Sequence, residues 1–161
     1  MKRNIMFITF TFVVFLAWNM LEANINGKII KDEIKAYFRP TVHIDYKPSD
    51  NQIKTIEIGG TPSMKICDLY KEDGTAVYNT NQHIERITKY INSLILVQAT
   101  DDELPNMSPD TVIKYLDDKG EAVQTFIIFG QIFIKDCNND KLYRVKSSAK
   151  GIVNELEEFM K

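Results

Sequence analysis

The chain has 161 residues, of which 44% are hydrophobic and 26% are charged, a balance typical of a globular protein. Its 22 acidic and 20 basic residues give a formal net charge of −2. Binding to nucleic acid requires a basic surface that neutralises phosphates, and the lysines here are scattered along the chain. We therefore expect no nucleic-acid partner.

The first 23 residues have the pattern of an export signal. Lys2 and Arg3 precede an uncharged apolar stretch of 14 residues from Ile5 to Trp18. A signal peptide needs an apolar stretch of about 7–15 residues, whereas a membrane-spanning helix needs about 20. We predict a signal peptide over residues 1–23 that is cut after Ala23, with an uncleaved N-terminal anchor as the alternative.

This segment predicts that the protein works outside the cytoplasm, either secreted or anchored, and meets the membrane only through residues 1–23. Residues 24–50 are predicted to form a helix and an extended lead-in. Pro40 ends the helix, whose apolar positions recur at spacings of three and four. Those positions are Ile30, Ile34, Tyr37 and Phe38, and the lead-in then alternates apolar Val42, Ile44 and Tyr46 with polar residues.

Residues 51–161 are predicted to form a compact α+β domain. Its first half reads as strands over 53–58 and 64–70, paired antiparallel, with a short third strand over 75–78. A helix follows, with N-cap candidates in Asn79-Thr80-Asn81. If Asn81 is the cap, its stripe contains Ile84, Ile87, Thr88 and Ile91, and a strand over 94–98 comes next.

The second half reads as four strands joined by tight turns and followed by a helix. The strands are predicted over 111–116, 122–129, 131–135 and 142–145, and Ser147 or Ser148 caps the terminal helix. Short turns require antiparallel neighbours, so these strands form a meander. The stretch 122–129 is the most apolar strand of the domain, which predicts a central position. The predicted fold is thus a single curved antiparallel sheet with helices packed on one face.

Four stretches of the domain resemble an uncharacterised family of small exported proteins of Gram-positive bacteria, many of which are lipoproteins. They are Ile53–Ile58, Asn81–Ile87, Gly130–Lys135 and Lys141–Val145, within a resemblance that covers about residues 50–161. The resemblance implies an α+β fold at the cell envelope but assigns no functional residues. This chain lacks the cysteine that carries the lipid in such lipoproteins.

The sequence has few residues that could carry chemistry. His43 and His83 are its two histidines, and we expect both to be exposed surface residues. No zinc-binding spacing, nucleophile motif or phosphate-binding glycine loop occurs, so no cofactor is predicted. Cys67 and Cys137 could pair as a disulfide in an exported protein, but we expect two free thiols, one of them buried. The aromatic residues of the meander are expected to pack in the core: Tyr115, Phe126, Phe129, Phe133 and Tyr143.

Three functions remain open from the sequence. The leading hypothesis is a non-enzymatic interaction module whose partner is another envelope or secreted protein. The second is an inhibitor of a secreted hydrolase, with a protein-contact loop formed by Leu104, Pro105, Asn106 and Met107 and stiffened by prolines. The third is a small envelope hydrolase in which carboxylates distant in the sequence converge.

Overall fold

The computed structural model describes residues 34–48, 52–60, 67–104, 108–146 and 150–161. Contacts divide the chain into two units, Met1–Arg39 and Pro40–Lys161. In the first unit residues 34–38 are helical, and the rings of Tyr37 and Phe38 are 67% and 80% exposed. The predicted export signal over 1–23 lies outside the described residues. No helix in the part of the chain that the structure describes is long and apolar enough to cross a membrane.

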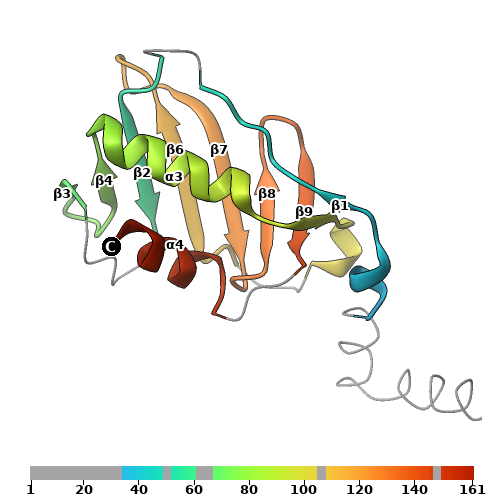
Figure 1. Ribbon diagram of the computed structural model, residues 1–161. Helices are drawn as coiled ribbons and strands as arrows, with labels where there is room; N and C mark the ends of the chain where they lie inside the picture. The colour runs from blue at the N-terminus through green and yellow to red at the C-terminus, as the bar shows by residue number, and fades with distance from the viewer. Residues whose placement is uncertain (1–33, 49–51, 61–66, 105–107, 147–149) are drawn as a thin grey trace, which may run out of the picture. The chain divides into compact units, whose positions relative to one another are not determined.

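The second unit contains one antiparallel sheet of nine strands in the order β1-β5-β9-β8-β7-β6-β2-β4-β3 (Figure 1). This confirms the prediction of an α+β fold with one antiparallel sheet. The unit starts at Pro40, before the boundary predicted at residue 51, because β1 joins the sheet. The strands are β1 (Thr41–Val42), β2 (Thr55–Gly59), β3 (Leu69–Tyr70), β4 (Ala76–Tyr78), β5 (Leu96–Gln98), β6 (Thr111–Leu116), β7 (Ala122–Phe129), β8 (Phe133–Asp136) and β9 (Lys141–Val145).

Strands β6 to β9 are consecutive neighbours, because each is joined to the next by a short turn. Gly120 and Asp140 adopt positive φ angles of 79° and 48° in two of these turns, a conformation that glycine and aspartate tolerate better than most residues. Strand β7 lies fifth in the order of nine, as its apolar sequence predicted.

The strand predicted over 64–70 pairs differently from the expectation. Its described part, β3, pairs with β4, and β4 lies between β3 and β2. The tight turn at Gly74, whose amide donates to Lys71 O, makes β3 and β4 immediate neighbours. All three residues of β4 are buried and it lies inside the sheet, whereas Leu69 of β3 is 59% exposed and β3 is the edge strand. Residues 64–66 lie outside the described residues.

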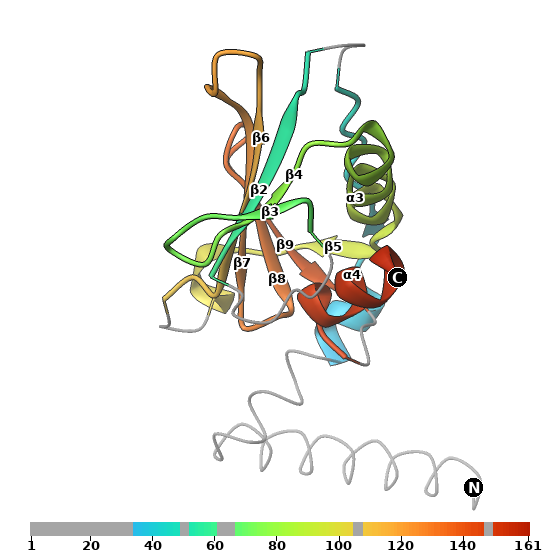
Figure 2. The ribbon, with the colours of Figure 1, turned by 90° about the vertical axis from the view of Figure 1, so that its left-hand side faces the viewer.

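Helices α3 (Asn81–Ser93) and α4 (Ile152–Met160) lie over the same face of the sheet (Figure 2). Of the three predicted cap candidates, Thr80 caps α3, because its side chain accepts a hydrogen bond from His83 N. The buried face of α3 is formed by Ile84, Ile87, Tyr90 and Ile91. A short 3-10 helix, η1 (Asp101–Glu103), follows β5.

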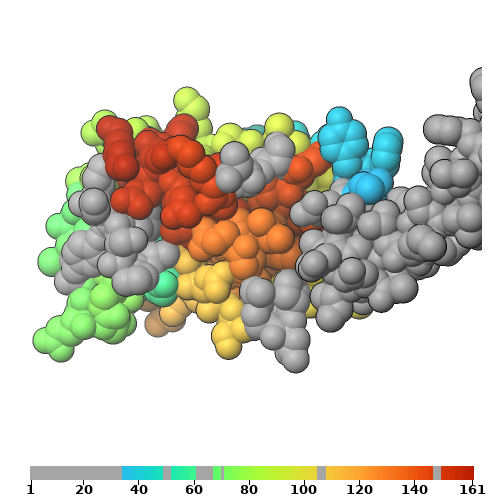
Figure 3. Space-filling view, turned by 90° about the horizontal axis from the view of Figure 1, so that it is seen from below, coloured from blue at the N-terminus to red at the C-terminus, as the bar shows by residue number. Residues whose placement is uncertain are grey.

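The start of α4 is positioned by the turn between β7 and β8. Gln131 accepts hydrogen bonds from Ile152 N at its backbone oxygen and from Val153 N at its side-chain oxygen, at 2.9 and 3.0 Å. Gly151 precedes the helix with a φ of 90°, and a Cβ there would lie 2.7 Å from Gln131 Cβ. The turn (orange) and α4 (dark red) lie side by side in Figure 3. The caps predicted at Ser147 and Ser148 lie outside the described residues.

The core has two parts, one on each face of the sheet. The larger lies under the helices and contains Tyr115 and Phe126. The smaller lies on the opposite face, where Phe129, Phe133 and Leu142 pack with Ala99. The aromatic residues of the meander are therefore core residues, as predicted, with Tyr143 packed at the edge of the larger part.

A buried polar pair lies within the helix-side face. Gln124 and Asp136 are each 5% exposed, and Gln124 Nε2 donates to Asp136 Oδ1 over 2.7 Å. The same oxygen accepts from the amides of Asn138 and Asn139, and Oδ2 accepts from Asn139 Nδ2 at 2.7 Å. The carboxylate thus organises the β8–β9 turn and satisfies a buried amide.

We predict that Asp136→Asn lowers the free energy of unfolding by about 1–3 kcal/mol, because an amide nitrogen then faces a donor in a buried network. Asp140→Asn is the matched control. Its carboxylate lies at the surface and contacts Lys135 Nζ at 2.8 Å, so stability should not change measurably. Urea unfolding followed by circular dichroism compares them, and equal losses would contradict the structural role of Asp136.

The candidate disulfide is not formed, since Cys67 and Cys137 both carry free thiols. Cys67 precedes β3 and Cys137 follows β8, and these strands are five positions apart in the sheet. At about 4.8 Å between strands this separation is roughly 24 Å, whereas a disulfide needs Cα atoms within about 7 Å.

We predict that two thiols per chain react with Ellman's reagent in denaturant whether or not a reductant was present beforehand. A protein that shows thiols only after reduction would contain the bridge and would contradict the strand order given above.

Candidate functional site

Residues 43–48, here called the strap, run in an extended conformation beside α3 and over the strands β7 to β9 (Figure 1). Their burial alternates, as the sequence predicted. His43, Asp45 and Lys47 are exposed, Ile44 is buried and Tyr46 is half-buried. The strap therefore covers part of the helix-side face with two side chains.

Two side-chain contacts attach the strap to α3 and its C-terminal end. Asn92 accepts a hydrogen bond from Tyr46 N at 3.1 Å and donates one to Tyr46 O at 2.8 Å, so its amide acts like a neighbouring strand. His43 Nδ1 lies 3.1 Å from Leu94 O. As the strap advances from residue 43 to 46, its contacts move from residue 94 back to 92, so it runs antiparallel to α3.

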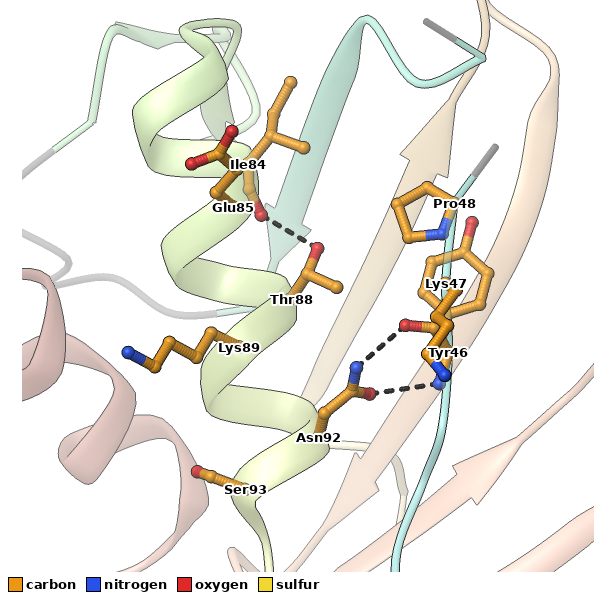
Figure 4. Close-up of a pocket in the computed structure, with 9 residues that line it drawn as sticks. All are labelled: Tyr46, Lys47, Pro48, Ile84, Glu85, Thr88, Lys89, Asn92 and Ser93. Carbon is orange, nitrogen blue, oxygen red and sulfur yellow. Dashed lines mark hydrogen bonds between the residues drawn. The ribbon is translucent and has the colours of Figure 1, made fainter. Parts of the chain in front are cut away.

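A groove of about 700 Å³ lies between α3 and the strap (Figure 4). Ile84, Thr88 and Asn92, which are spaced by four residues, form its helix wall, and Tyr46 and Pro48 form the other. This volume falls within the range of about 300–1,000 Å³ that is typical of ligand sites.

The lining of the groove is mainly apolar, with charges at its rim. Thr88 Oγ1 donates to Ile84 O at 2.8 Å, and Figure 4 shows its methyl group directed toward the strap. Lys47, Lys89 and Glu85 also line the groove, and the Lys47 ammonium group is paired with the Asp45 carboxylate at 3.2 Å. The groove can therefore hold an apolar group, with polar contacts left to its edges.

Tyr46 closes the bottom of this region. Its ring packs edge-on against Tyr115, with ring centroids 5.0 Å apart, and against Phe126 at 6.1 Å. The Tyr46 hydroxyl is buried without a hydrogen-bond partner, and burial raises its pKa. An unpartnered buried hydroxyl costs about 1–3 kcal/mol, so the closed strap carries an energetic penalty.

A second, smaller pocket of about 120 Å³ lies on the other side of the strap. It is polar, and two carboxylates, Asp45 and Asp136, line it. The Asp136 oxygens are occupied by the network that holds the β8–β9 turn, while Asp45 lies 3.2 Å from Lys47 Nζ. Among the described residues no group of three or more His, Cys, Asp or Glu side chains could hold a metal ion.

The two histidines have different surroundings. His43 is exposed, as predicted, although its ring contacts the end of α3. His83 was expected to be exposed but is half-buried, because its ring packs edge-on against Tyr78 and its Nδ1 lies 3.0 Å from Asp68 Oδ1. The other Asp68 oxygen accepts hydrogen bonds from Asn79 N and Thr80 N, so this carboxylate ties the segment before β3 to the start of α3.

The predicted contact loop can be followed only at its first residue. Leu104 is half-buried and packs against the smaller apolar cluster, so its side chain supports the fold. Pro105, Asn106 and Met107 lie outside the described residues.

The sequence reasoning missed the two residues that shape the groove, Tyr46 and Asn92. A signal for Asn92 was present, since it continues the helical spacing of Ile84 and Thr88 on one face of α3. Its bonding to an extended segment 46 residues away could not be read from that spacing.

No family model matches the chain, and no curated protein or solved structure is significantly similar to it. The resemblance to small exported proteins of Gram-positive bacteria therefore stays a prediction.

Asp68 gives a testable pH dependence. Burial alone would raise its pKa, but the amides of Asn79 and Thr80 and the contact with His83 together lower it. Because the pKa of the folded state lies below that of the unfolded chain, the charged carboxylate stabilises the fold above about pH 4, and this contribution is lost as the pH falls further.

We therefore expect Asp68→Asn to reduce stability at pH 7 and to make stability less dependent on pH below pH 4, as measured by urea unfolding. Asp118→Asn, at an exposed turn carboxylate, should retain the acid dependence of the unmodified protein. An unchanged acid slope in Asp68→Asn would show that this carboxylate does not anchor α3.

Proposed function

We propose that this protein is an exported, non-enzymatic interaction module that binds another envelope or secreted protein through the groove between α3 and the strap. The observation that carries this proposal is the groove itself, an apolar trough of about 700 Å³ with walls from two different elements. Apolar side chains inserted into such depressions supply most of the energy of many protein contacts.

The shape of the groove suits a short extended segment. Its helix wall runs from Ile84 to Asn92, which is about 12 Å at a rise of about 1.5 Å per residue. An extended chain advances about 3.3 Å per residue, so three or four residues of a partner match this length.

The proposed location rests on the N-terminal sequence. A basic start followed by an apolar stretch of signal length supports export, and either release or retention by an uncleaved anchor leaves the sheet domain outside the cytoplasm. The resemblance to exported proteins of Gram-positive bacteria agrees with that location.

The two alternative functions have less support. The inhibitor hypothesis relied on a projecting loop, and its one described residue, Leu104, is engaged in packing. The hydrolase hypothesis relied on converging carboxylates, and Asp136, the buried one of the two carboxylates that line the smaller pocket, is used to hold a turn. No specific observation favours either over an interaction module.

We predict that Thr88→Arg, which fills the groove, abolishes capture of the partner from envelope extracts. Thr125→Arg is the matched control, because Thr125 lies opposite Lys114, an exposed residue on the far face of the sheet. A protein recovered equally by the unmodified chain and by Thr125→Arg, but at least tenfold less by Thr88→Arg, supports the proposal.

Quantitative mass spectrometry measures the recovery, and calorimetry with the purified partner then gives the affinity. Thermal unfolding must show that both variants are folded. Equal recovery by both arginine variants would place the binding surface elsewhere.

A further inference from the structure

We propose that the strap is a movable wall of the groove, which opens locally while the rest of the sheet domain stays folded. The purpose of this motion, admission of a partner, rests on the proposed function. The motion itself rests on three features of the described residues that are independent of any partner.

The first feature is the bonding of the strap. Within the part of the chain that the structure describes, no backbone-to-backbone hydrogen bond joins residues 43–48 to another segment. Side chains alone make the attachment, through Asn92 to the Tyr46 backbone and through His43 to Leu94 O. Strands of the sheet are held by ladders of backbone bonds, so the strap can detach without breaking a ladder.

The second feature is the space beside the strap. The groove of about 700 Å³ lies on its α3 side, and the pocket of about 120 Å³ lies on its β7–β9 side. Tyr46 lines both, so this residue separates two cavities. Protein interiors are usually close-packed, and a segment with empty space on two sides loses fewer contacts when it moves.

The third feature is the buried Tyr46 hydroxyl, which has no hydrogen-bond partner while the strap is closed. Opening brings this group into contact with water and satisfies it. This gain offsets part of the cost of exposing Ile44 and the Tyr46 ring. The free-energy difference between the open and closed states is therefore smaller than the loss of apolar burial alone would make it.

Opening also defines what can enter. Removal of Tyr46 joins the apolar groove beside Ile84 to the polar pocket beside Gln124 and Tyr143. The occupant that fits this space has the pattern of the strap itself, an extended polypeptide segment with apolar side chains two residues apart.

Native-state hydrogen exchange of the full-length protein tests the motion without a partner. The Tyr46 amide donates to Asn92 Oδ1 and so reports whether the strap is closed, and the amides of the central strand β7 report global unfolding. We expect the Tyr46 amide to exchange at least tenfold faster than the β7 amides, with a rate nearly independent of low urea concentrations. A Tyr46 rate that follows those of β7 across the urea series would overturn the proposal.

Asn92→Ala and Ser93→Ala form the matched pair. Asn92→Ala removes both hydrogen bonds between the Asn92 side chain and the Tyr46 backbone. Ser93→Ala removes only a hydrogen bond to Tyr90 O within α3. Asn92→Ala should accelerate exchange at Tyr46 by a further tenfold relative to β7, and Ser93→Ala should not. Equal effects of the two variants would mean that Asn92 does not hold the strap closed.

The outcome is separable from that of the capture experiment. If the strap opens locally but no partner depends on the groove, the movable strap is supported and the proposed function is refuted. If a partner binds the groove but the strap opens only on global unfolding, the proposed function stands and the movable strap is refuted.

Discussion

The area of the sheet that must be kept from water is the constraint on which the rest of the structure depends. Nine strands at about 4.8 Å from neighbour to neighbour make a sheet roughly 38 Å wide. Helix α3 has 13 residues and is about 20 Å long, and α4 has only nine residues. Two such helices cannot cover the whole face, so Ile44 and Tyr46 of the strap cover part of what remains. The groove exists because an extended segment replaces a helix beside α3.

The parts of the fold that depend on neighbouring residues could be predicted from the sequence. Strands β6 to β9 were recognised because alternation and tight turns are local signals, and Gly120 and Asp140 lie where the turns require a positive φ. The order of β3 and β4 was not recognised, because two short strands can pair with β2 in either order. The turn at Gly74 makes β3 and β4 neighbours in both orders, and the pairing of β4 with β2 is a contact between segments distant in the sequence.

The site could be predicted less well, because its parts come together only in the folded chain. The alternation of the strap was visible, but Ile44 and Tyr46 could have belonged to an ordinary strand. Asn92 is a polar residue at the end of an amphipathic helix, and such residues usually face water. Its side chain instead bonds both backbone groups of Tyr46. His83 was misplaced for a similar reason, since its burial depends on Tyr78 and Asp68, which belong to other segments.

The strap differs from most of the described core in that a buried polar group of its own has no hydrogen-bond partner. Gln124 is paired with Asp136, and the buried Tyr90 hydroxyl donates to Ile152 O at 2.6 Å. Two hydroxyls of the described residues, those of Tyr46 and Thr111, are buried without a hydrogen bond. The Tyr46 hydroxyl belongs to a segment whose backbone has no ladder and which separates two cavities. A segment that served only to cover the sheet would gain stability from a paired hydroxyl and a filled cavity. The strap combines an unpaired hydroxyl, a backbone without a ladder and unfilled space on two sides. Such features are expected at a binding site, because its surface has to remain available for a partner.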